Sequence, residues 1–124
     1  MNKPPTKQGL ARIIGAAGYS LSGLKACFVN EAAFRQEVLF FTILLPILFL
    51  LPVSGFMKIV LLLVNTLVLI VELLNSAIEA IVDKASPELN DLAKRAKDMG
   101  SAAVLLSLLV AGAAWVVVLS SVLL

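Results

Sequence analysis

The sequence predicts an all-α membrane protein, and three observations support that fold class. Hydrophobic residues make up 60% of the 124 residues, far above the content of a soluble domain. They gather in three blocks, at 38–53, 59–82 and 99–124. The last two blocks are long enough to cross a hydrocarbon core of ~30 Å as helices that rise ~1.5 Å per residue. We therefore expect a single domain over residues 1–124 with three transmembrane helices.

A shorter helix is expected before the spans. Apolar residues recur at helical spacing through "LARIIGAAGYSLSGL", while Arg12, Ser20 and Lys25 lie away from the centre of the apolar stripe. This pattern predicts an amphipathic helix at about 8–29 that lies on the membrane surface. Periodicity alone does not distinguish a plain membrane anchor from a functional element.

The three spans are expected at about 32–52, 57–82 and 98–122. The first apolar block is short, so its span should include part of "AAFRQE". Pro46 should kink or loosen this helix, which a bundle tolerates when neighbouring helices bond the freed carbonyl. The segment "SPELNDLAKRAKD" predicts a turn at Ser86 and Pro87 and then a charged helix that runs into the third span.

Basic residues predict the orientation. They cluster before the first span and between the second and third spans, whereas only Lys58 lies between the first and second. By the positive-inside rule, the N-terminus and the 83–98 segment face the cytosol and the C-terminus lies on the far side. The N-terminus shows no signal-peptide pattern, so we expect it to be retained.

Composition excludes several kinds of chemistry. The chain has no histidine and one cysteine, Cys27, so a Cys/His zinc site, haem ligation by histidine and an internal disulfide are not expected. The net charge of +2 is small and the basic residues are mixed with acids, so we expect no nucleic-acid partner. The chain also lacks the G-x-x-x-x-G-K-[ST] loop and the protein-kinase motifs. Any ATP chemistry must therefore use an unrelated site.

The second span ends in a polar stripe. In "VELLNSAIEAIVDK", Glu72, Asn75, Glu79 and Asp83 fall within an arc of roughly 80° on one helix face. An ionised carboxylate facing lipid would cost at least ~2.5–3.5 kcal/mol. This face must therefore contact protein, water or a bound cation.

One chain has too few helices to enclose such a stripe, so we expect a homo-oligomer. Small residues at i, i+4 and i+8 in the third span, Ala103, Ser107 and Ala111, offer a close-packing face for self-association. Asn65 lies deeper in the second span, where an interhelical hydrogen bond is a simpler expectation than a ligand contact.

Two more polar groups lie at the same membrane level, in "NEAAFRQE" and "KRAKDMGS". Carboxylates from two helices with an amide nearby suit Mg²⁺, a hard cation that carboxylates share with substrate phosphates. Nearby Lys and Arg side chains would complete a nucleotide-phosphate site. Taken singly, Glu31 could equally form an i,i+4 ion pair with Arg35, and Lys97 could be an ordinary interfacial anchor.

Two functions of different class fit this layout. An enzyme acting on a lipid headgroup needs a base at the interface and a water-soluble cosubstrate from the cytosol. A small proton-coupled transporter is the alternative, although it usually needs a path open to both sides. Here the polar residues crowd on one side, which favours the enzyme.

Four segments together resemble one family. "ARIIGAAGYS", "NEAAFRQE", "VELLNSAIEAIVD" and "AKRAKDMGSAAVLL" are similar, in order and spacing, to the prokaryotic diacylglycerol kinases, which are small integral-membrane lipid kinases. The resemblance implies a homotrimer in the bacterial inner membrane, with a periplasmic C-terminus and active sites shared between neighbouring subunits. It implies transfer of the γ-phosphate of Mg-ATP to the free hydroxyl of diacylglycerol, giving phosphatidate. A branch that phosphorylates undecaprenol remains an alternative.

The same resemblance implies roles for individual residues. The general base falls on Glu72, and the Mg²⁺ ligands fall on Glu31 and Glu79. The implied ATP contacts are Arg12, Tyr19, Glu31, Glu79, Glu88, Asn90, Lys97 and Asp98. The implied lipid contacts are Arg12, Ala17, Ser20, Gln36, Glu37, Glu72 and Ser101. Asn75 and Asp83 would support the site.

Overall fold

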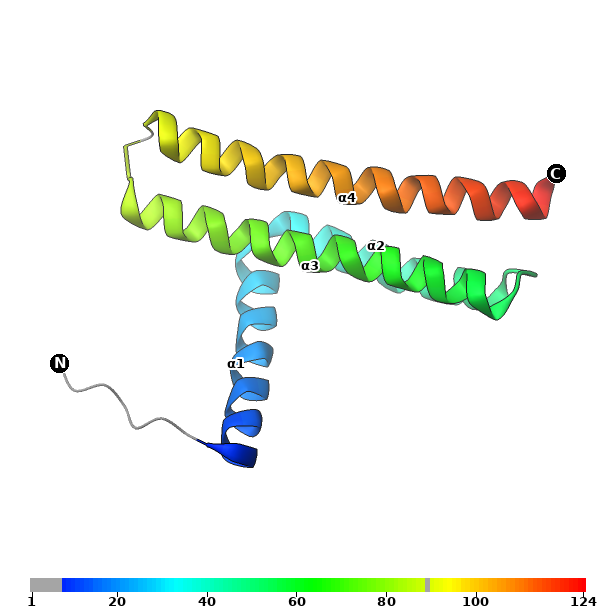
Figure 1. Cartoon of the computed structure of the whole chain (residues 1–124), viewed down its shortest axis with the longest axis horizontal. Helices are drawn as coiled ribbons and strands as arrows, with labels where there is room; N and C mark the ends of the chain where they lie inside the picture. Colours follow the sequence, from blue (N-terminus) through cyan, green and yellow to red (C-terminus); the bar gives the residue numbers. More distant parts are fainter. Residues whose placement is uncertain (1–7, 89) are drawn as a thin grey trace.

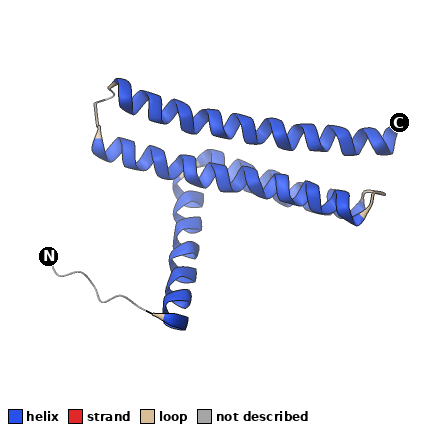
Figure 2. Cartoon of the chain, viewed as in Figure 1, coloured by secondary structure: helices blue, strands red, loops and turns tan. Residues whose placement is uncertain are grey.

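The computed structural model describes residues 8–88 and 90–124. Within these ranges the chain forms four α-helices and no strand: α1 (Gly9–Asn30), α2 (Ala32–Leu50), α3 (Gly55–Ala85) and α4 (Asp91–Leu123) (Figures 1 and 2). Helices α2, α3 and α4 are long and apolar enough to cross a membrane. The predicted all-α membrane fold is therefore confirmed, while the homotrimer and the single-domain boundary at 1–124 stay predictions. Residues 1–7, with two of the basic residues used for orientation, lie outside the described ranges.

Helix α1 runs across the direction of the other three helices and projects away from them (Figure 1). Its one buried residue is Cys27, near its C-terminal end, where Cys27 Sγ lies 3.5 Å from Ser76 Oγ of α3. The large apolar side chains of its first turns are exposed, including Leu10, Ile13 and Ile14. This arrangement suits a helix whose apolar face covers the membrane surface.

Helices α3 and α4 lie side by side and antiparallel (Figure 1). The buried residues of α3 are Leu61, Val68 and Glu72. The buried residues of α4 are Ala93, Gly100, Ser107, Ala111 and Val118. Steps of seven and four residues are typical of helices that pack at a shallow angle, because seven residues nearly complete two turns. The two helices therefore form a hairpin with one continuous seam.

The prediction that small residues of the third span form a face for self-association is wrong for two of the three residues. Ser107 and Ala111 are buried within the chain, whereas Ala103 is exposed. Small side chains allow close backbone approach in either setting. Here α4 uses that property inside the chain instead of at a surface between subunits.

The expected interhelical bond of Asn65 is confirmed. Trp115 Nε1 of α4 donates to Asn65 Oδ1 of α3 at 2.9 Å. An apolar cluster of Leu48, Leu61 and Val118 lies beyond this pair, toward the end of the bundle that carries the 51–54 turn. Helix α2 continues through Pro46 as one helix.

The connection between α3 and α4 forms as the sequence predicts. Asn90 caps α4, since its Oδ1 accepts from the backbone N–H of Ala93 at 2.8 Å. Its Nδ2 also donates to Ser86 Oγ at 3.2 Å. Helix α4 begins at Asp91, so the charged segment and the third span form one helix. The ends of α3 and α4 that this connection joins extend past the junction of α1 and α2 (Figure 1).

Candidate active site

The polar stripe of α3 faces the other helices of the chain. Glu72 is only 6% exposed, Asn75 and Glu79 are half-buried, and Asp83 is exposed at the end of the helix. The stripe continues the seam of Asn65 and Val68 with the same steps of four and three residues. Within the stripe, burial is therefore greatest at Glu72 and decreases toward Asp83.

Asn75 is held between Glu79 and α4. Its Nδ2 donates to Glu79 Oε1 at 3.4 Å. Its Oδ1 is buried and accepts no hydrogen bond from the described residues. That oxygen lies against Gly100, where an added Cβ would overlap with it. Gly100 therefore makes the room that Asn75 occupies.

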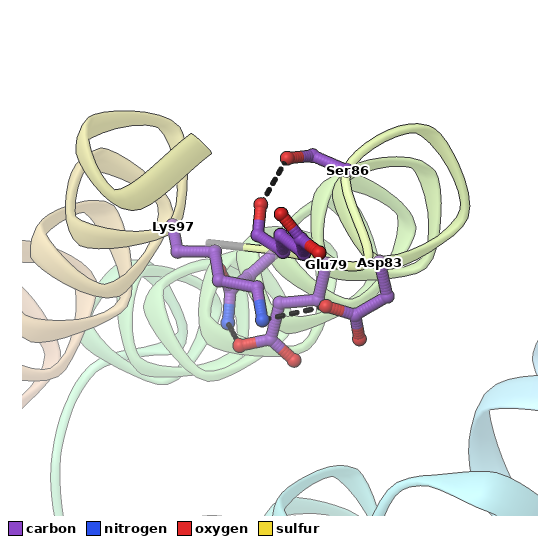
Figure 3. Close-up of polar contacts among 6 residues, drawn as sticks. Glu79, Asp83, Ser86 and Lys97 are labelled. Atoms are coloured by element: carbon purple, nitrogen blue, oxygen red, sulfur yellow. Dashed lines mark hydrogen bonds and ion pairs between the residues drawn. The ribbon is translucent and has the colours of Figure 1, made fainter. Parts of the chain in front are cut away.

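An ion pair joins the ends of α3 and α4 beside the stripe. Lys97 Nζ lies 2.6 Å from Asp83 Oδ1, with Glu79 alongside (Figure 3). The charge of Lys97 also interacts with the carboxylate of Glu79. One turn earlier on α4, Lys94 pairs with Asp98 at 2.7 Å, with both side chains exposed. The stripe thus has an ammonium group at its outer end.

The buried end of the stripe lies in the electric field of three other carboxylates. Glu31, from the junction of α1 and α2, and Glu37, from α2, interact electrostatically with Glu72, as does Glu79. The ion pairs among residues 8–88 and 90–124 are Lys94–Asp98 and Lys97–Asp83, so none of these four acids has such a partner there. Acids that have no ion-pair partner favour a bound cation.

The donor set suits a metal that also binds substrate oxygens. In the described part of the chain, no three His, Cys, Asp or Glu side chains converge closely enough to hold a metal by themselves. Glu31 and Glu79 supply hard oxygen donors, and Mg²⁺ is normally held by one or two carboxylates together with phosphates and water. The residues present therefore fit Mg²⁺ carried in with a nucleotide.

Glu31 occupies the joint between two helices, and Arg35 does not pair with it. Arg35 Nη1 donates instead to the carbonyl oxygens of Phe28 at 2.8 Å and Val29 at 2.9 Å. The alternative of an i,i+4 ion pair for Glu31 is therefore not what the structure shows. The carboxylate of Glu31 is left without a cationic partner among the described residues.

Within one chain, several of the remaining predicted site residues lie away from the carboxylates. Arg12, Ala17, Tyr19 and Ser20 are exposed along α1, which points away from the stripe (Figure 1). Ser20 Oγ donates to its own helix, to Ala16 O at 2.9 Å. The other exposed members are Gln36, Glu88, Asn90 and Ser101. Of these, Asn90 has the capping role described above.

An apolar groove opens beside Glu37. It has a volume of about 270 Å³ and lies between α2 and α4, with Asn65 and Val68 of α3 as its floor. Its walls are Phe40, Phe41 and Leu44 on α2 and Leu108, Ala111, Gly112 and Trp115 on α4. Sequence reasoning missed this groove, because its walls come from two helices that are far apart along the chain.

Together these features define a small integral-membrane protein with an acidic site where its helices meet the surface helix. A family model described as prokaryotic diacylglycerol kinase matches residues 18–119. The chain is 53% identical over 111 residues to a diacylglycerol kinase of Pseudomonas aeruginosa, with 90% of each chain covered. It is 50% identical over 113 residues to that of Escherichia coli K12, covering 91% of this chain and 93% of the relative.

A diacylglycerol kinase of Haemophilus influenzae is 43% identical over 107 residues. The chain belongs to the prokaryotic diacylglycerol kinase family, and it is an enzyme, a kinase embedded in the membrane. The resemblance found in the four sequence segments is thereby confirmed. The roles of individual site residues stay predictions.

Proposed function

We propose that the protein transfers the γ-phosphate of Mg-ATP to the free hydroxyl of diacylglycerol and releases phosphatidate and ADP. The observation that carries this proposal is the carboxylate of Glu72, which is buried within an apolar bundle and interacts electrostatically with three other carboxylates. The names of the relatives support the choice of lipid. A carboxylate at this depth can meet a hydroxyl group held at the membrane interface.

The reaction needs one base and one phosphoryl donor. Glu72 accepts the proton of the lipid hydroxyl as that oxygen forms a bond to the γ-phosphorus. The bond between the γ-phosphorus and the oxygen that bridges it to the β-phosphate breaks, and ADP leaves. The absence of an ion pair to Glu72 among the described residues leaves its carboxylate available for this proton.

Groups in the outer part of the site would neutralise the charge on the phosphates. Glu31 and Glu79 would hold Mg²⁺, which neutralises charge on the β- and γ-phosphates when it is bound. Lys97 lies beside Glu79 and would contact the phosphates directly. Asn75 would keep the Glu79 carboxylate in place through its side-chain amide.

The exposed position of the α1 residues supports a shared site. Arg12 and Tyr19, the implied ATP contacts, lie on a helix that points away from the carboxylates of its own chain. In the proposed homotrimer, each active site combines the α3 carboxylates of one subunit with surface-helix residues of a neighbour. Such an assembly would also cover exposed apolar residues of α3, such as Leu63 and Leu67.

The apolar groove supports a lipid substrate. It begins at Glu37, whose charge acts on Glu72, and it continues between aromatic and aliphatic side chains. One acyl chain of diacylglycerol would lie in it while the hydroxyl reaches Glu72. By the distribution of basic residues, the site faces the cytosol at the bacterial inner membrane and the C-terminus is periplasmic.

Phosphoryl transfer in mixed micelles tests the proposal. Purified protein receives Mg-ATP labelled in the γ-phosphate and either diacylglycerol or undecaprenol. Label in phosphatidate that disappears in Glu72→Gln but persists in Asp91→Asn, an exposed acid outside the site, supports the proposal. Label only in undecaprenyl phosphate would replace the substrate. No label from protein of wild-type oligomeric size would overturn the kinase mechanism and favour proton-coupled transport.

A further inference from the structure

Helices α1 and α2 are joined through a single residue. Helix α1 ends at Asn30 and α2 begins at Ala32, so Glu31 alone connects them, with extended backbone angles φ −118° and ψ 109°. Arg12 lies ~28 Å along α1 from this joint at ~1.5 Å per residue. A rotation of about 10° at Glu31 would therefore move Arg12 by about 5 Å.

Arg35, in the first turn of α2, binds the end of α1 across this joint. Its guanidinium donates to the carbonyl oxygens of Phe28 and Val29, in the last turn of α1. Those carbonyls have no intrahelical partner because the helix ends at Asn30. The backbone N–H of Arg35 donates to Glu31 O at 3.2 Å. A cation at a helix C-terminus is also favoured by the helix dipole.

We infer that Arg35 is a positioning residue that fixes α1 relative to α2 and so sets the place of the Glu31 carboxylate. The inference rests on the proposed function, because a fixed α1 matters only if residues of α1 contact the nucleotide. With the joint held, the Glu31 carboxylate keeps its position relative to Glu72, and the residues of α1 keep a fixed position for the nucleotide. Arg35 acts through the backbone of α1 and touches no reacting atom.

Lys58 provides a matched control within the same chain. Its Nζ donates to Phe49 O, near the C-terminal end of α2, at 2.8 Å. This contact is also a cation on a helix-end carbonyl, but it lies at the 51–54 turn, at the opposite end of the bundle. Lys58→Gln therefore removes the same kind of contact without touching the joint.

Two measurements on full-length protein test the inference. Spin labels at Ile13→Cys and Ile81→Cys, both exposed positions, report the distance between α1 and α3. Cys27→Ser removes the native thiol, and dilution with unlabelled protein suppresses distances between subunits. The second measurement is KM for Mg-ATP and KM for diacylglycerol in mixed micelles.

We expect Arg35→Gln to broaden the distance distribution and to raise KM for Mg-ATP about tenfold, the scale of losing charge-assisted hydrogen bonds. KM for the lipid should change less than KM for Mg-ATP. Arg35→Lys, which keeps a positively charged donor, should restore part of both effects, and it replaces Arg35→Gln in the test if that variant does not fold. Lys58→Gln should match the wild type.

An unchanged distance distribution in Arg35→Gln would overturn the inference, even with a raised KM, because Arg35 would then act on the nucleotide directly. A broadened distribution with an unchanged KM for Mg-ATP would overturn it as well. If the wild type transfers no phosphate at all, the proposed function fails. The distance measurement still tests the joint in that case.

Discussion

Gly100 of α4 lies against the side-chain oxygen of Asn75 on α3, and an added methyl group would overlap with that oxygen. The contact joins the two helices at the level of the acidic stripe. It also holds the amide that donates to Glu79. A packing contact between two helices therefore sets the position of a proposed Mg²⁺ ligand.

Replacing Gly100 should destabilise the protein through this contact alone. Gly100→Ala is expected to lower the free energy of unfolding by about 1 kcal/mol, the low end for overpacking, because the overlapping oxygen is at the end of a side chain that can move. In an Asn75→Ala background the cost should fall below about 0.5 kcal/mol, because the clashing group is gone. Unfolding of micelle-bound protein in increasing SDS measures both values.

Gly112→Ala is the control for that comparison. Open space surrounds Gly112, so its substitution should be neutral or stabilise the helix by up to about 1 kcal/mol. Equal costs of Gly100→Ala with and without Asn75 would show that the two residues are not in contact.

The Asn65–Trp115 hydrogen bond should contribute measurably inside the membrane. A double-mutant cycle with Asn65→Leu and Trp115→Phe is expected to give a coupling energy of about 0.6–1.7 kcal/mol, the range for bonds between transmembrane helices. Thr66→Val is the control, since Thr66 Oγ1 donates to Leu62 O of its own helix and should not couple to Trp115. A zero coupling for Asn65 would contradict the bond.

Asn75 should control the requirement for Mg²⁺. Loss of a group that orients a metal ligand typically costs about 10- to 100-fold in metal affinity. Asn75→Ala is therefore expected to raise the half-saturating Mg²⁺ concentration about tenfold, and Glu79→Gln should raise it further. Chelation of Mg²⁺ should stop phosphoryl transfer, and added Mg²⁺ should restore it. An Mg²⁺ activation curve that is unchanged in both variants would remove Glu79 from the metal site.

Substitution of Lys97 should affect the binding of Mg-ATP more than the stability of the protein. The ion pair of Lys97 with Asp83 is solvent-exposed on the Asp83 side, where 64% of the side chain is accessible, so Lys97→Met should leave the free energy of unfolding nearly unchanged. KM for Mg-ATP should rise about tenfold if Lys97 contacts the phosphates. Asp83→Asn breaks the same ion pair but keeps Lys97, so it isolates the structural contribution. Equal KM values for Mg-ATP in the two variants would mean that Lys97 acts only through the ion pair.

Local sequence patterns were enough to predict the membrane class, the helices and the face on which the acids lie. Those properties are local: apolar length sets a span, and about 100° per residue places Glu72, Asn75 and Glu79 on one face. Asn65 could be predicted for the same reason, because a polar side chain in a span needs a partner on another helix.

Which residues oppose one another depends on how the helices pack in three dimensions. The α3–α4 register sets Gly100 against Asn75, and it turns Ser107 and Ala111 inward instead of toward another subunit. The joint at Glu31 leaves Arg35 closer to the last carbonyls of α1 than to the neighbouring carboxylate. Helical periodicity says which side chains share a face, but the packing of whole helices decides what that face contacts.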